Sequence, residues 1–436
     1  MKRINNSVIA LSLFIGIANA NAQEKKQLSL DEAVQLGIQN SKSLKIDAAK
    51  IEEATADLLA AKNRQLPDLS VSGSYLYLPL KPNIDLKIPG VASGGPEVHQ
   101  VAYGSANLSV PIYSGGRIKY GIQSAKYLVE ASKLSTENDK VAIAYNVAQA
   151  YNNLFKANQS IKVLEENLSA SQKRDETFLK LENNGVIARN DRLKANLQTS
   201  NIELQLLEAR NNYNIANINM DLLLGLPDAT EIEVDKQYID EADDVKPVDF
   251  YLNEARENRK DLQALDQQRK AAELGTRSAK AENLPSIAFT GGYVAADIPK
   301  FLTIYNAVNV GVGVSYNLSN LWKENSSLKQ SKAREMQLSA TNELLNDNIK
   351  LDVNREFQNT DYSKKRIAVF EKAAVQANEN YRITKNKYDN GLATMTELLD
   401  ADAAQISANV GVINAKADAA LAYRKLLQTT GTLTIK

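Results

Sequence analysis

Short segments in which apolar and polar residues alternate predict four β-strands. The clearest is 306–318, where Val308, Val310, Val312 and Val314 share one face and small polar residues share the other. Weaker alternation predicts strands at about 70–77, 101–110 and 287–294. At roughly ten residues each, these segments have the length and one-sided pattern of outer-membrane strands. A half-buried antiparallel sheet in a soluble domain would show the same pattern.

Two long stretches without proline, from about Gly116 to Asn183 and from about Lys323 to Asp389, predict very long helices. With a rise of 1.5 Å per residue, each would reach about 100 Å, which is typical of coiled coils and not of a globular core. An Asn-Gly pair follows each stretch and predicts a tight reversal, because glycine can take a positive φ. We therefore expect two long antiparallel hairpins.

The returning helices have heptad spacing, which predicts the seam of each hairpin. The second seam would consist of Leu399, Ala403, Ile406, Val410, Ile413, Ala417 and Ala420, and the first of Leu193, Leu197, Ser200, Leu204 and Leu207.

These elements form one unit that occurs twice. The turn Asn184-Gly185-Val186 recurs as Asn390-Gly391-Leu392, an offset of 206 (391 − 185). Each copy contains a helix, Leu-Pro, two strands, a very long helix, an Asn-Gly turn and a long helix. We predict repeats at 23–226 and 248–436, joined by an acidic linker at 227–247. The fold class is thus mainly α with a small β part.

Residues 1–22 have the features of a secretory signal peptide. A basic start, Met1-Lys2-Arg3, precedes an apolar stretch of about eleven residues, and small residues follow at Ala20 and Ala22 as cleavage sites. No later segment has the 18 or so consecutive apolar residues of a membrane-spanning helix. If the exported chain enters a membrane, it must therefore do so as a closed β-barrel, in which every backbone polar group is paired.

The composition argues against several classes of function. The 52 Lys+Arg balance the 52 Asp+Glu, so no excess of basic charge indicates nucleic-acid binding. There is no cysteine and a single histidine, His99, which excludes disulfides, thiol nucleophiles and cysteine-based metal sites. We found no nucleophile–base pair or phosphate loop, and we expect neither an enzyme nor a cofactor.

Four strands per chain are too few for a membrane barrel, since the smallest have about eight. Two copies of the chain would give a barrel filled by side chains, whereas three would give twelve strands and an aqueous lumen. The sequence alone leaves two or four subunits open.

Several motifs, in this order and duplicated, resemble the TolC-like outer-membrane efflux proteins over about Leu28 to Gly431. They are Leu28-Ser29-Leu30-Asp31-Glu32-Ala33, Val110-Pro111-Ile112-Tyr113-Ser114-Gly115-Gly116-Arg117, Asn184-Gly185 through Ala195, and Asn390-Gly391 through Ala401. The resemblance implies a homotrimer in outer-membrane lipid, with a 12-stranded barrel and a periplasmic tunnel of coiled-coil hairpins. It also implies docking to an inner-membrane transporter through a periplasmic adaptor. The cargo, and the choice between an efflux pump and a type I secretion system, stay open.

The resemblance also implies a gate at the periplasmic end of the tunnel. Glu397 and Asp400 occupy the positions of acidic residues that ring the family's entrance, and Tyr388 matches a tyrosine that helps to close it. In the first copy, position 397 corresponds to Asp191. The family's basic partner after the second turn is replaced by Ala393, so the closing link must use other residues, with Arg189 as a candidate. Two acids near a helix start could instead simply favour the helix dipole.

The two turns would be the surface on which the adaptor docks, namely Asn184, Gly185, Val186, Asn390, Gly391 and Leu392. The alternative is that the Asn-Gly pairs have only a structural role in the turns. A trimeric coiled-coil adhesin or structural stalk with a membrane barrel is a rival function. It is disfavoured because its strands would be consecutive at the C-terminus and its helices parallel. A periplasmic enzyme is disfavoured by the lack of a catalytic constellation.

Overall fold

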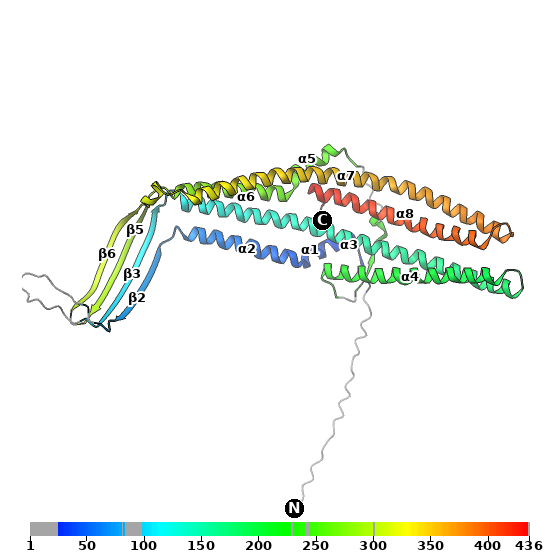
Figure 1. Ribbon diagram of the computed structural model, residues 1–436, viewed down its shortest axis with the longest axis horizontal. Helices are drawn as coiled ribbons and strands as arrows, with labels where there is room; N and C mark the ends of the chain where they lie inside the picture. Colours follow the sequence, from blue (N-terminus) through cyan, green and yellow to red (C-terminus); the bar gives the residue numbers. More distant parts are fainter. Residues whose placement is uncertain are drawn as a thin grey trace, which may run out of the picture.

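The computed structural model describes residues 25–80, 82, 98–227, 230–239, 245–299 and 301–434. A four-stranded sheet stands at one end of an elongated molecule and two helical tips stand at the other (Figure 1). A small mixed region surrounds the long helices near the middle. The predicted signal peptide at 1–22 lies outside the described residues.

The sheet is antiparallel, and its strands stand in the order β2-β3-β5-β6. Their bounds are Asp68–Tyr77 for β2, Gln100–Tyr113 for β3, Ser286–Ile298 for β5 and Leu302–Ser315 for β6. All four predicted strands are therefore confirmed. The prediction for the last was shifted by about three residues, because Leu318–Leu321 turns into a short 3-10 helix, η2.

The register gives the sheet one apolar and one polar face, because residues directly opposite each other point the same way. Val71 pairs with Ala106, Ala106 with Tyr293, and Tyr293 with Val308, so one apolar row crosses all four strands. In β6 this face is open, and Val310 is 74% exposed. On the other face a row of small and polar residues crosses the four strands, namely Ser70, Asn107, Gly292 and Asn309. On the same face the hydroxyls of Ser72 and Ser105 are 2.9 Å apart.

The helices follow the predicted repeat. In the first copy they are α2 (Lys42–Asn63), α3 (Arg117–Asn183) and α4 (Arg189–Leu224), and in the second α6 (Lys260–Ala281), α7 (Ser326–Asp389) and α8 (Met395–Thr430). The starts of α4 and α8 differ by the predicted offset of 206 (395 − 189). α3 folds back on α4 and α7 on α8, which confirms both hairpins (Figure 1). Within the described residues, no helix is both long and apolar enough to cross a membrane.

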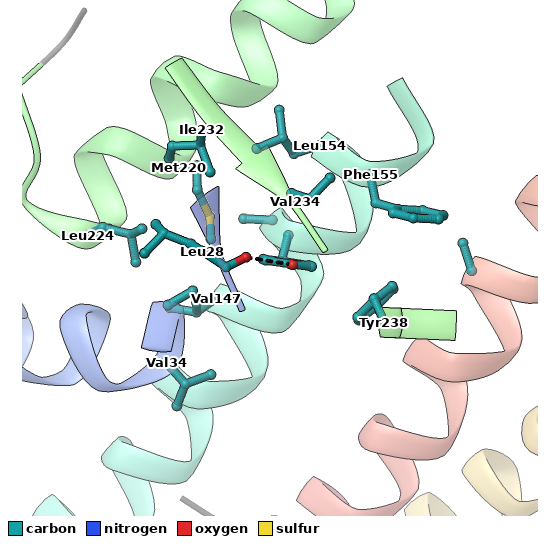
Figure 2. Close-up of a cluster of buried hydrophobic side chains, with 14 of the residues drawn as sticks. Leu28, Val34, Val147, Leu154, Phe155, Met220, Leu224, Ile232, Val234 and Tyr238 are labelled. Carbon is teal, nitrogen blue, oxygen red and sulfur yellow. Dashed lines mark hydrogen bonds between the residues drawn. The ribbon is translucent and has the colours of Figure 1, made fainter. Parts of the chain in front are cut away.

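The middle of the molecule contains a core that the sequence reading did not resolve into elements. β1 (Lys25–Leu28) pairs in parallel with β4 (Glu231–Val234), which lies in the predicted linker. α1 (Leu30–Asn40) and η1 (Lys236–Ile239) contribute to the same core, whereas α5 (Val248–Asn258) packs on α7 and α8. The Tyr151 hydroxyl donates to Leu28 O at 2.9 Å and accepts from Asp235 N–H at 2.7 Å, so α3 holds both strands. Figure 2 shows the apolar side chains around this junction.

The predicted seam of the first hairpin was wrong, because the predicted leucines do not form the contact between α3 and α4. Leu193, Leu197, Leu204 and Leu207 are exposed on α4. The buried row on α4 lies two residues away, at Ala195, Thr199, Ile202, Leu206 and Ala209. Near the tip of α8 the buried residues also differ from the predicted row, since Leu398 and Ala401 are buried while Ala403 is exposed. Farther along α8, Ile406, Ala417 and Ala420 are buried as predicted.

Candidate functional site

The two hairpin turns have the same backbone geometry at equivalent positions. Gly185 has φ 69° and Gly391 has φ 74°, the left-handed region that favours glycine. In each turn the N–H of the following residue reaches back five positions, from Val186 to Leu181 O (2.8 Å) and from Leu392 to Lys387 O (2.7 Å). These bonds satisfy carbonyls at the end of the long helix, so the predicted glycine-dependent reversal is confirmed.

Both turns carry an exposed apolar side chain beyond the glycine. Val186 is 66% exposed and Leu392 is 77% exposed, and the flanking Asn184 and Asn390 are exposed too. Each tip of the chain thus ends in a small apolar point surrounded by polar groups.

Glu397 lies in the first turn of α8 and closes a capping box with Thr394. Its carboxylate accepts from the Thr394 backbone N–H at 2.6 Å and from the Thr394 hydroxyl at 2.9 Å. These two bonds, the backbone one first, lower the pKa of Glu397. Asp400, one turn further, is exposed. Both carboxyl groups therefore lie at the surface of the second tip. Glu397 also caps α8, and this role needs no second copy of the chain.

The first tip differs at the matching positions. Ala188 replaces the capping threonine and offers no side-chain cap. Asp191 therefore lacks the capping role of Glu397, and its carboxylate lies 3.6 Å from the Lys194 ammonium.

Tyr388 connects the two hairpins near their tips. It is half-buried at the end of α7, and its ring centroid lies 5.8 Å from that of Phe178 on α3. Burial is the main cause that raises the pKa of Tyr388, and the negative charge of Asp191 is the next. The structure thus brings together Tyr388 and Asp191, two of the predicted gate residues, from different repeats.

An ion pair that sequence reasoning missed joins the hairpins below this contact. One Arg174 guanidinium nitrogen lies 3.1 Å from each Asp402 carboxylate oxygen, linking α3 to α8. The side chains are only 14% and 4% exposed, respectively. Beside the pair, Phe178 and Ala195 from the first hairpin pack with Met395 and Leu398 from the second.

No pattern in the sequence marks Arg174 or Asp402, because a charged residue on a long helix usually faces water. Arg189, the sequence candidate for the closing link, is exposed and forms none of the ion pairs found among the described residues.

The comparisons with known proteins agree with this architecture. The sequence matches the outer membrane efflux protein family over residues 33–226 and 251–432. Comparison with curated proteins gives no match.

Solved structures with the same fold include three outer-membrane proteins. VceC from Vibrio cholerae has a TM-score of 0.76 at 17% identity, covering 92% of this chain and 96% of that one. The CmeC outer membrane channel of Campylobacter jejuni has 0.76 at 17%, covering 93% and 86%. The MtrE outer membrane channel of Neisseria gonorrhoeae, in its open state, has 0.73 at 18%, covering 93% and 89%. The family match covers most of the chain, so this protein belongs to the outer membrane efflux protein family, whose members are non-enzymatic channels of the outer membrane.

Proposed function

We propose that three copies of the chain form a passive exit duct that is gated at its periplasmic end. The observation that carries this proposal is the amphipathic four-stranded sheet with two open edges. Among the described residues, β2 pairs only with β3 and β6 only with β5. An unpaired edge cannot be hydrated inside hydrocarbon, so the sheet needs further strands to seal it.

Closure by identical copies satisfies both edges. Pairing β2 of one copy with β6 of the next gives twelve strands in a trimer, enough for an aqueous lumen. The apolar row through Val71 and Val308 would then face lipid, and the polar row through Ser70 and Asn309 would line the lumen. Two copies would give eight strands, whose interior side chains fill the barrel. The trimer therefore suits a duct.

The exposed leucines of α4 support the same assembly. Leu193, Leu197, Leu204 and Leu207 keep heptad spacing, and the row continues through Ile215, Ile218 and Leu222. A water-exposed apolar stripe of this length is a typical contact surface. We assign it to the neighbouring copy, so that each helix in the tunnel wall packs on both sides.

The gate would be formed at the tips. In a trimer Glu397 and Asp400 each occur three times, and their carboxylates would form two acidic rings that attract cations and repel anions. The contact of Tyr388 with the first hairpin and the Arg174–Asp402 pair would hold the two hairpins of each copy together in the resting state.

The partners are a periplasmic adaptor and, through it, an inner-membrane transporter of an efflux pump or a type I secretion system. The exposed Val186 and Leu392 would fit into apolar contacts with adaptor hairpins. A photo-crosslinking amino acid at position 186 or 392 should capture a periplasmic protein in cells. Capture of outer-membrane lipid alone would contradict docking at the tips.

Assembly is tested by mass measurement of the detergent-solubilised mature chain. The native protein should be trimeric, and the double variant Leu204→Asn/Leu207→Asn should yield mainly smaller species. The control Glu203→Gln/Glu208→Gln changes exposed neighbours outside the stripe and should remain trimeric. A monomeric native protein, or full trimer yield from the leucine variant, would refute the arrangement.

The gate is tested in planar bilayers under a salt gradient. Glu397→Gln/Asp400→Asn should lower the preference for cations, whereas Glu343→Gln, an exposed acid on α7 far from the tip, should not. An unchanged reversal potential in the double variant would remove the gate assignment. The rival stalk or adhesin predicts no steady conductance from either protein.

A further inference from the structure

The helix α2 is attached to α3 through an unusual contact. Its only buried residue is an aspartate, Asp47, which is 4% exposed. Large apolar side chains of α2, Ile46 and Leu59, are exposed instead. Among the described residues, α3 is the one element that makes extensive contact with α2. The attachment of this helix therefore depends on how the Asp47 carboxylate is satisfied.

One of the two Asp47 carboxylate oxygens is paired with a lysine, and the other has no hydrogen-bond donor among the described residues. Oδ1 lies 2.9 Å from the Lys50 ammonium, one turn along α2. Oδ2 is buried and has no hydrogen-bond donor among the described residues. On α3, the carboxyl group of Asp139 is close enough to interact with Asp47 both by charge and by a side-chain hydrogen bond.

Charge counting favours a proton in this contact. Two carboxylates and one ammonium carry a net charge of −1, and one added proton makes the group neutral. A divalent cation would reverse the charge and would need several further oxygen ligands, but the described residues contain no cluster of three or more acidic or histidine side chains for a metal. Two adjacent carboxyl groups cannot easily both be ionised away from water.

The other groups near the pair do not replace that proton. Asn138 also interacts with Asp139 and stabilises its charged form. The next charged residues on α3, Glu137 and Lys140, are paired with each other at 2.7 Å. Burial is the main cause that raises the pKa of Asp139, followed by the charge of Asp47, while Lys50 acts in the opposite direction.

We propose that the Asp139 carboxyl group carries a proton that it donates to Asp47 Oδ2, and that this hydrogen bond fastens α2 to α3, so that acid tightens the contact and neutral pH loosens it. Because packing raises the pKa of Asp139, the contact is strongest below its ordinary value of 3.8. The contact weakens as the pH rises through the raised pKa. α2 lies alongside α3 in Figure 1. The proposal itself concerns contacts within one chain and does not depend on the trimer.

Hydrogen exchange of the full-length protein in detergent, between pH 4.5 and 7.5, tests this. After correction for intrinsic exchange, peptides of α2 should lose protection as the pH rises, while peptides of α6 should not. The loss should be about tenfold for each unit by which packing raises the pKa. Asp139→Asn should keep α2 protected throughout the range, and the control Asp57→Asn, an exposed acid on α2, should behave like the native protein.

A second variant distinguishes a proton-dependent hydrogen bond between the two carboxyl groups from packing that does not depend on pH. Lys50→Gln removes the charge that favours ionisation, so the transition should move to higher pH. Constant protection of α2 in the native protein, or the same transition in Asp139→Asn, would overturn the proposal. Restoration of protection by Mg²⁺ at pH 7.5 in the native protein, but not in Asp139→Asn, would show a cation site instead and would overturn it as well.

Discussion

The Arg174–Asp402 ion pair should raise the free energy needed to separate the two hairpins of the chain. Asp402→Asn removes the charge that balances Arg174 while keeping the size of the side chain. The pair is 14% and 4% exposed, so the variant leaves a guanidinium charge largely cut off from water. Breaking a buried pair in this way costs about 3–5 kcal/mol. We expect the lower end, because the second terminal nitrogen of Arg174 already lacks an acceptor among the described residues.

A loss of about 3 kcal/mol corresponds to roughly a hundredfold larger population of separated hairpins. Hydrogen exchange should therefore accelerate by about that factor in residues 171–180 of α3 and 395–406 of α8. The matched control is Arg382→Gln. Arg382 also makes a two-point contact, with Glu379, but those side chains are 63% and 53% exposed. An exposed pair of this kind contributes about 0–1 kcal/mol.

The double variant Arg174→Met/Asp402→Leu distinguishes a lost charge balance from lost packing. Replacing a buried ion pair by apolar residues is often neutral or stabilising, so the double variant should exchange nearly as slowly as the native protein. If Asp402→Asn exchanges no faster than the Arg382→Gln control, the pair does not hold the hairpins together. If the double variant is as fast as the single one, the charge argument is wrong.

Three further variants test local contacts. Gly411→Leu should destabilise the α7–α8 hairpin by about 1–3 kcal/mol, because even a Cβ there would lie 2.6 Å from the Phe370 ring. Thermal unfolding would measure the loss, and an unchanged melting temperature would contradict the packing. Tyr151→Phe removes the hydrogen bonds of the hydroxyl to Leu28 O and Asp235 N–H, at about 1 kcal/mol each, so exchange in residues 25–28 should rise while the tips stay unchanged. Gly391→Val should cost about 1–2 kcal/mol through its positive φ alone, since its Cβ would meet open space; Gly391→Asn should cost less, and equal costs would argue against backbone strain.

Periodicity in the sequence predicted the elements of the fold but not which faces meet. Strand alternation located all four strands of the sheet, because an amphipathic sheet must repeat every two residues. On α4 the heptad row at Leu193, Leu197, Leu204 and Leu207 was real, yet it lies outside the hairpin. A helix in a wall has neighbours on two sides and carries two interleaved apolar rows, and spacing alone cannot tell which row meets its own partner. The larger residues misled the prediction, since Ala195 and Thr199 fill the inner row.

Only those features of the hairpin tips that depend on neighbouring residues could be predicted from the sequence. The Asn-Gly reversals follow from the backbone freedom of glycine, and the capping box of Thr394 and Glu397 is a local pattern that spans four residues. The Arg174–Asp402 pair joins residues 228 positions apart, and the pairing of β1 with β4 spans about as much of the chain. Nothing at either end of such a contact marks its partner, so neither was predicted.

The two hairpins have kept one geometry while their tips have changed in chemistry. Both turns retain the glycine and the backward N–H bond, so the reversal is a requirement common to both copies. At the next position that matters, Thr394 caps α8 and directs the Glu397 carboxylate back toward the turn, whereas Ala188 leaves Asp191 uncapped beside the other hairpin. The same acidic position therefore serves helix capping in one copy and contact with Tyr388 in the other. Because the reversal depends on the glycine and the backward N–H bond, the capping residue can differ between the copies without altering the turn.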